Sequence, residues 1–247
     1  MSEKGQRTLQ ALVLAILGLF LILKIYDGRI LLYINQRFLP IIFLAALGLI
    51  ILSQVILRPP RPQSHDQHLD CPSESHPSMP LWVIWLMALP VIIGVFIPER
   101  PLDANSIELR GINLQSPFTQ NRSLESVIEI PSERRNILDW MRLFYLEGDI
   151  KRLEGEKADI TGFVYRDPSL PPSQILVGRY AITCCVADAV AVGIVVETDL
   201  AKNLSSNLWV RVIGSIKIIQ DQEKSRPIIL ATQVDIVPEP NQPYLFP

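Results

Sequence analysis

The sequence is poor in the residues that enzymes most often use for chemistry. It has three histidines and three cysteines in 247 residues, and every histidine lies before residue 80. A cysteine in the C-terminal half therefore has no histidine in that half to act as its base. The patterns HExxH, GxSxG, GxxxxGK(S/T) and GxGxxG are also missing. We expect no enzymatic activity and no catalytic residues.

An excess of positive charge is missing too. Lysine and arginine total 23 against 25 aspartates and glutamates, which gives a net charge of −2. Proteins that bind nucleic acid neutralise its phosphates with a basic patch or stripe, and the sequence has no such stripe. We therefore expect no nucleic-acid partner.

Three long uncharged apolar runs lie within the first hundred residues, at 9–23, 38–57 and 81–97. A helix needs about 20 mostly apolar residues, within a range of about 17–25, to cross the hydrocarbon core of a bilayer. Lys4 and Arg7 precede the first run, but no small-x-small cleavage site follows it, so we expect this run to remain as an anchor. The sequence thus predicts a multi-pass membrane protein with three N-terminal transmembrane helices and the lipid bilayer as a partner.

These runs also divide the chain. Residues 1–57 hold two transmembrane helices, 58–80 a loop rich in His, Cys, Pro and Ser, 81–97 the third helix, 98–131 a connector, and 132–247 a helix followed by a β domain. Basic residues flank the three helices evenly, so the orientation depends on Lys4 and Arg7, which favour a cytoplasmic N-terminus. Three crossings then place the C-terminal domain outside the cytoplasm.

The C-terminal part has the pattern of one helix and five strands. The stretch 132–148 has an apolar face at helical spacing, with Ser132 as N-cap and Gly148 after its end. Gly162 and Gly214 lie inside strand patterns, where glycine marks the bulges or bends that close a barrel. The fold class is an α + β membrane protein with a C-terminal OB-like all-β barrel domain, and a five-stranded sandwich stays open. The expected strands are the β-branched runs at 158–167, 175–188, 192–198, 208–219 and 227–237.

Two adjacent cysteines, Cys184 and Cys185, lie in the second of these expected strands. Neighbouring residues of a strand point to opposite faces, so the two thiols are expected to lie apart. A disulfide between them needs strained geometry. Burial as small apolar side chains is one interpretation, and a second candidate metal site is the other. In either case Asp188 is expected to orient the turn that follows.

The first candidate metal site is the loop, where the ligands are His65, His68, Cys71 and His76. His65, His68 and Cys71 are each three residues apart, which puts three N/S ligands on one face of a helical turn. Imidazole and thiolate suit Zn²⁺ or another divalent metal. The spacing is no standard zinc-finger pattern, and the prolines and serines between the ligands are typical of a linker. A metal-binding loop and a plain linker are both open.

Several short motifs occur in a fixed order along nearly the whole chain, and Cys-Cys-x-Ala-Asp is the most specific of them. They are Leu89, Pro90, Gly94 and Pro98, then PLD at 101–103, GFVY at 162–165, CCVADA at 184–189 and WVRVIGSI at 209–216. In these motifs the chain resembles the YcgQ-like family of bacterial membrane proteins, which are described as permease subunits. The resemblance implies the smaller subunit of a two-component membrane permease complex, a polytopic permease subunit as partner, a bacterial plasma membrane location, and a link to metal or ion homeostasis.

Two functions follow from these observations. The first is a non-channel subunit of such a complex, because uncharged helices offer no ion path of their own. The alternative is a membrane-anchored OB-like binding or sensing module with no transport role. That module needs exposed aromatic side chains along one groove, and Tyr165, Tyr180 and Trp209 are the candidates.

Overall fold

The computed structural model describes residues 3–58, 81–97, 100–113, 127–147, 149–221 and 224–247. The chain divides into two compact units, Met1–Arg100 and Pro101–Pro247. The first unit is helical and the second is built around a β barrel, so the composition change near residue 100 marks a real boundary.

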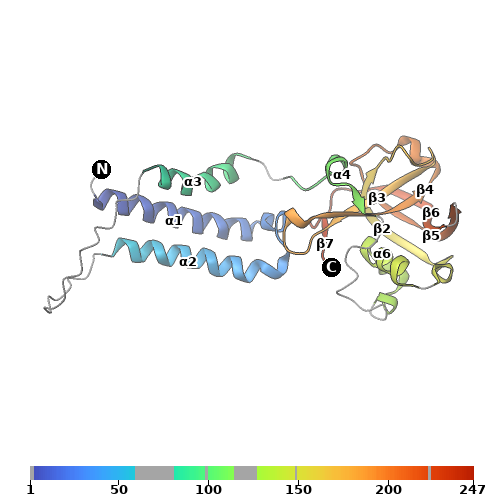
Figure 1. Cartoon of the computed structure of the whole chain (residues 1–247), viewed down its shortest axis with the longest axis horizontal. Helices are drawn as coiled ribbons and strands as arrows, with labels where there is room; N and C mark the ends of the chain where they lie inside the picture. Colours follow the sequence, from blue (N-terminus) through green and yellow to red (C-terminus); the bar gives the residue numbers. More distant parts are fainter. Residues whose placement is uncertain (1–2, 59–80, 98–99, 114–126, 148, 222–223) are drawn as a thin grey trace. The chain divides into compact units, whose positions relative to one another are not determined.

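Two long helices form the centre of the first unit, α1 (Glu3–Tyr26) and α2 (Leu39–Leu57). They lie side by side and are joined by two short 3-10 turns, η1 (Arg29–Leu32) and η2 (Gln36–Phe38) (Figure 1). The Ser53 hydroxyl donates to the carbonyl oxygen of Ala11 at 2.8 Å, which satisfies a buried polar group between the helices. Gly18 leaves room for Ala46, whose carbonyl oxygen would lie 2.8 Å from a Cβ at this position. Small residues thus bring the two backbones close.

Only two of the described helices reach the length and hydropathy needed to cross a membrane, at Gly5–Tyr26 and Gln36–Leu57. The prediction of three transmembrane helices was therefore wrong. The third, α3 (Leu81–Phe96), has 16 residues and is about 24 Å long at about 1.5 Å per residue, short of a hydrocarbon core of about 30 Å. The apolar run continues to Ile97, but the helix ends at Phe96.

Five strands of the second unit close into a barrel: β2 (Lys157–Tyr165), β3 (Gln174–Ala181), β4 (Val190–Glu197), β5 (Trp209–Asp221) and β6 (Lys224–Ile236). Antiparallel pairing joins β5 to β2, β2 to β3, β3 to β4 and β5 to β6. A parallel pairing of β4 with β6 completes the ring. The five-stranded barrel is therefore confirmed, the closed ring excludes a sandwich, and its order agrees with an OB-like Greek key.

Short elements surround the barrel. β1 (Ile112–Asn113) pairs with β4 and β7 (Tyr244–Leu245) with β3, both in parallel. The helical elements are α4 (Asn105–Arg110), η3 (Ser132–Arg134), α6 (Ile137–Leu146), η4 (Ile150–Leu153), η5 (Val186–Asp188) and η6 (Asp199–Asn203).

Helix α6 begins later than the sequence predicts. Asn136, not Ser132, is the N-cap: its side chain accepts from the amides of Leu138 and Asp139, and Asp139 accepts from the Asn136 amide. This reciprocal capping box satisfies several free amides at once, which Ser132 does not do. Ser132 lies in the separate 3-10 turn η3 instead.

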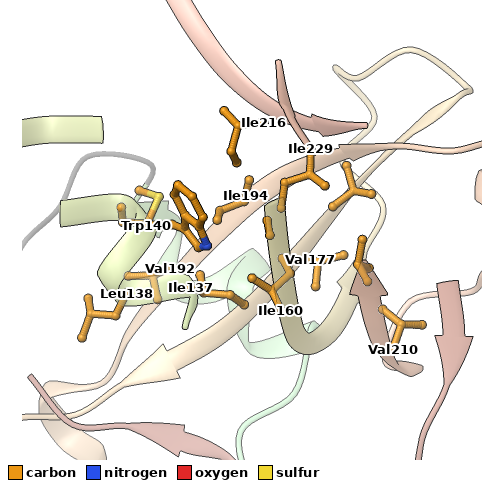
Figure 2. Close-up of a cluster of buried hydrophobic side chains, with 14 of the residues drawn as sticks. Ile137, Leu138, Trp140, Ile160, Val177, Val192, Ile194, Val210, Ile216 and Ile229 are labelled. Atoms are coloured by element: carbon orange, nitrogen blue, oxygen red, sulfur yellow. The ribbon is translucent and has the colours of Figure 1, made fainter. Parts of the chain in front are cut away.

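The capped helix packs against the barrel interior. Trp140 is fully buried, and Ile137 and Leu138 point with it toward strand residues such as Ile160 and Val192 (Figure 2). Each buried side chain of this size contributes about 1.5–3 kcal/mol. The cluster continues through side chains of several strands, among them Val177, Ile194, Val210, Ile216 and Ile229.

Gly162 and Gly214, the glycines that the sequence singled out, lie where two strands come very close. The pairing of β5 with β6 shifts register at Ile213/Gly214, and a Cβ on Gly214 would overlap the carbonyl oxygen of Leu230. A Cβ on Gly162 would lie 2.5 Å from the carbonyl oxygen of Gly178. A side chain at either position would force neighbouring strands apart.

Candidate functional site

The residues that the sequence singled out as ligands fall into two groups. His65, His68, Cys71 and His76 lie outside the described residues, so their metal binding stays a prediction. Cys184, Cys185 and Asp188 are described, and they come together on one turn of the barrel domain.

The sequence placed the cysteines within a strand and on opposite faces, and this was wrong. Strand β3 ends at Ala181, and Cys184 and Cys185 lie in its connection to β4. Their sulfur atoms are 3.7 Å apart, with Cys184 exposed and Cys185 half-buried. The thiols therefore form one adjacent pair at the protein surface.

Asp188 folds the chain back at this point. Its carboxylate accepts from the backbone amides of Thr183 at 2.9 Å, Cys184 at 2.7 Å and Cys185 at 3.4 Å, the last of these the weakest. The Asp188 amide returns a hydrogen bond of 3.0 Å to the carbonyl oxygen of Cys185. Asp188 thus orients the turn that precedes it, in contrast to the predicted role in the turn that follows. An acidic side chain three residues after the N-cap of a short helical turn, here Asp188 after Cys185, is the capping-box signal that could have revealed this.

The electrostatics of the turn favour a protonated thiol in the absence of a cation. The hydrogen bond to Asp188 raises the pKa of Cys184 to about 11, and its contact with Cys185 adds to this. Partial burial acts to raise the pKa of Asp188, but hydrogen bonds from the Cys184 thiol and from the three amides outweigh it, so the pKa is lowered. The carboxylate is therefore ionised at neutral pH beside two sulfurs that could become thiolates.

The arrangement matches the coordination of a soft metal ion. One ligand atom each from Cys184, Cys185 and Asp188 lies within 4.8 Å of the other two. Two thiolates on a tetrahedral zinc ion, each at about 2.3 Å, are about 3.8 Å apart, and the two sulfurs here are separated by 3.7 Å. Thiolate ligands select Zn²⁺, Cu⁺ and related ions. Three ligands leave a fourth position open, as in sites that exchange what they bind.

Arg179, the nearest arginine in the sequence, does not activate these thiols. Its guanidinium donates to the carbonyl oxygens of Gln242 and Pro243 and lies 5.7 Å from the ring centroid of Trp209. Burial lowers the pKa of Arg179 to about 10, so it stays charged at neutral pH. Its role is to hold the C-terminal segment against β3, where the Ile182 amide donates to the Leu245 carbonyl oxygen at 3.0 Å. This pairing supports the start of the cysteine turn.

The aromatic residues expected along a ligand groove are packed instead. Tyr180 is buried, stacks on Phe163 at 5.6 Å, and donates its hydroxyl hydrogen to the carbonyl oxygen of Asp103 at 3.0 Å. Trp209 meets the ring of Phe163 edge-on, and Tyr165 packs against the same cluster. These side chains fix the segment around Asp103 to the barrel, and they give no support to a groove that binds a ligand.

Comparison with known proteins identifies the family. The N-terminal DUF1980 domain matches residues 9–113 and the C-terminal DUF1980 domain matches residues 115–247. The chain belongs to the DUF1980 family. The expected resemblance is confirmed, because one DUF1980 relative is the "UPF0703 protein YcgQ" of Bacillus subtilis. It is 21% identical over 266 residues, which cover 89% of this chain and 92% of the relative.

A second relative comes from Streptococcus mutans and is named "Putative two-component membrane permease complex subunit". It is 24% identical over 198 residues, covering 65% of this chain and 72% of the relative. Together with the apolar helices α1 and α2, this likeness indicates that the DUF1980 chain is associated with a membrane. Among solved structures, an OBody bound to hen egg-white lysozyme matches 35% of this chain and 83% of its own, with 13% identity and a TM-score of 0.25.

Proposed function

We propose that this DUF1980 chain is the non-channel subunit of a two-component membrane permease complex that handles a thiol-binding metal ion. The name of the Streptococcus mutans relative supports the place in a complex. The proposal of a metal rests on the group formed by Cys184, Cys185 and Asp188, because the two sulfur atoms are as far apart as two thiolates on one ion.

The path through the membrane belongs, in this proposal, to a polytopic partner. Intramembrane ionisable residues usually mark ion paths, and α2 has none. The apolar part of α1 is uncharged as far as Lys24. Helices of this kind anchor and dock against other helices, and Gly48, which has no atom near its Cβ position, leaves α2 open to such contact.

In this proposal the cysteine turn, formed by Cys184, Cys185 and Asp188, binds the metal ion reversibly before the ion passes to the partner. Its exposed cysteine and open fourth position allow an ion to arrive and leave, which a closed structural zinc site does not. Ordering such a site costs little, because the three amides that donate to Asp188 already hold the turn in shape. We propose Zn²⁺ or another soft metal ion as the cargo, with no enzymatic step.

The location we propose is the plasma membrane of a bacterium. Lys4 and Arg7 favour a cytoplasmic N-terminus. Two crossings, by α1 and α2, then return the chain to the cytoplasm, so we propose a barrel on the cytoplasmic side, in place of the outside position that three crossings would have given.

Cellular metal content tests this function. A strain that lacks the chain is complemented in its native host with the wild type, with Cys184→Ser/Cys185→Ser, or with Thr183→Ser as a matched exposed control. We expect zinc or copper content to change on deletion, to be restored by the wild type and the control, and not by the double variant. Full restoration by the double variant would contradict a role for the turn.

A further inference from the structure

A cavity lies within the helical unit, between the C-terminal half of α1 and α3. Its volume is about 580 Å³, within the range of about 300–1,000 Å³ that is usual for small-molecule sites. Apolar side chains such as Leu21, Leu89 and Ile93 make most of its wall. Its apolar lining suits a hydrocarbon chain.

The polar residues of the cavity lining lie at the C-terminal end of α1 and in the turn that follows it. Lys24 stands in the last turn of α1, and Arg29 and Tyr33 follow the reversal at Gly28, whose φ is +69°. Both charged residues among the described lining are cations. They lie at the end of a helix of membrane-spanning length, which is the level of the lipid headgroups.

The shape of the cavity depends on two residues of α3. A Cβ on Gly94 would lie 2.5 Å from Cζ of Phe20, so glycine allows that ring to pack against the helix. The ring in turn lies 5.4 Å from the Lys24 ammonium, measured to its centroid, which draws this cation toward the cavity. Pro90, which also lines the cavity, has no amide hydrogen to donate to the Leu86 carbonyl oxygen, so α3 has one intrahelical hydrogen bond fewer beside the cavity.

We propose that this cavity binds one anionic phospholipid, with an acyl chain among the apolar side chains and the phosphate between Lys24 and Arg29. Basic pockets between membrane helices are known to take anionic headgroups, and two cations together with a hydrocarbon-lined space match both halves of such a lipid. The site is separate from the cysteine turn, and it ties the chain to the lipid composition of its membrane.

Lipid retention by the full chain tests the proposal. The chain is placed in vesicles of phosphatidylcholine and phosphatidylglycerol, extracted in detergent, and its bound lipids are counted by mass spectrometry. We expect phosphatidylglycerol to be enriched over phosphatidylcholine. Each cation near anionic lipid is worth about fivefold in affinity, so Lys24→Gln/Arg29→Gln should lower the affinity about 25-fold.

Two further variants separate the cavity from the surface. Arg7→Gln/Arg58→Gln removes the same charge from the opposite end of the α1–α2 pair, outside the cavity lining, and should keep the enrichment. Ile93→Phe keeps both cations and narrows the cavity; because Ile93 is 46% exposed, the larger ring does not enter a packed core, and the enrichment should fall.

Three results would overturn the proposal. One is equal lipid retention by the two charge variants, and another is full retention by Ile93→Phe. The third is displacement of the lipid by glycerol phosphate alone, which would show a headgroup site with no acyl chain. A fourth result, no enrichment of phosphatidylglycerol in the wild type, would overturn it as well and would leave the cavity to a helix of a partner subunit.

Discussion

The Asp188 carboxylate makes two kinds of interaction within one short turn. It accepts hydrogen bonds from the backbone amides that shape the turn, and it also lies against the thiol of Cys184. A cation bound among the three ligands would replace the thiol proton, since thiolate is the form that binds metal. The same carboxylate therefore favours the protonated thiol in the metal-free protein, and in the proposed metal site it would be one of the three ligands.

This gives a prediction for Cys184 in the metal-free protein. In a Cys71→Ser/Cys185→Ser background, alkylation of Cys184 by iodoacetamide should be slow at pH 8 and should rise as pH approaches 11, because only the thiolate reacts. Asp188→Asn keeps one oxygen, which can accept either from the Thr183 amide or from the amides of Cys184 and Cys185, and it removes the charge. The pKa should fall toward the ordinary 9.0, and the rate at pH 8 should rise by about one to two orders of magnitude.

The matched control for this experiment is Asp167→Asn. Asp167 also accepts from a nearby amide, that of Ser169 at 2.8 Å, but it lies in a different turn. Its replacement should leave the alkylation rate unchanged. An equal rate in Asp188→Asn and the wild type would show that Asp188 does not control the thiol.

Among the structural elements, the barrel depends on the close approach of strands at its glycines. Gly214 lies at the register shift between β5 and β6, Gly162 faces the Gly178 carbonyl oxygen, and a Cβ on Gly178 would lie 3.1 Å from the Val192 carbonyl oxygen. Backbone atoms cannot move aside as a flexible side chain can. The three positions therefore form a graded series.

We predict that Gly214→Ala destabilises the barrel most, Gly162→Ala less, and Gly178→Ala least. Forcing an extra methyl into a packed region costs about 1–3 kcal/mol, which for a domain of this size lowers the Tm by about 5–10 °C at the upper end. Thermal unfolding of the full chain in detergent, followed by the β signal in circular dichroism, measures this. A Tm for Gly214→Ala equal to that of Gly178→Ala would contradict the series.

The strands were predictable where one rule dominated. Alternating β-branched residues gave all five barrel strands, since no competing signal interrupts the runs. The same rule failed at Cys184. The letters ITCCV continue the β pattern, but hydrogen bonds to Asp188, several residues later, turn the chain. Strand propensity does not include such bonds. The α6 start failed in a similar way, because Ser132 and Asn136 are both good caps and only Asn136 has Asp139 to return its hydrogen bond. The cavity between α1 and α3 arises from tertiary packing, which the apolar runs alone do not specify.

For the complete chain, the side of the membrane that holds the barrel is a measurable consequence of the proposal. Alkaline phosphatase is active only outside the cytoplasm, so a fusion after Tyr33, between α1 and α2, should be active, and fusions after Arg58 and Pro247 should not. An active fusion at Pro247 would mean that α3 also crosses and that the barrel lies outside the cytoplasm.

The most direct test of the metal proposal is the zinc and copper content, with the affinity for each, of the purified full chain. The wild type is compared with Cys184→Ser/Cys185→Ser and with a variant in which His65, His68, Cys71 and His76 are all alanine. We predict one metal ion per chain in the wild type and in the loop variant, and at least a tenfold loss of affinity in the double-serine variant, since thiolates are the ligands that select these ions. Metal lost from the loop variant but kept by the double-serine variant would contradict the account and place the site in the histidine loop.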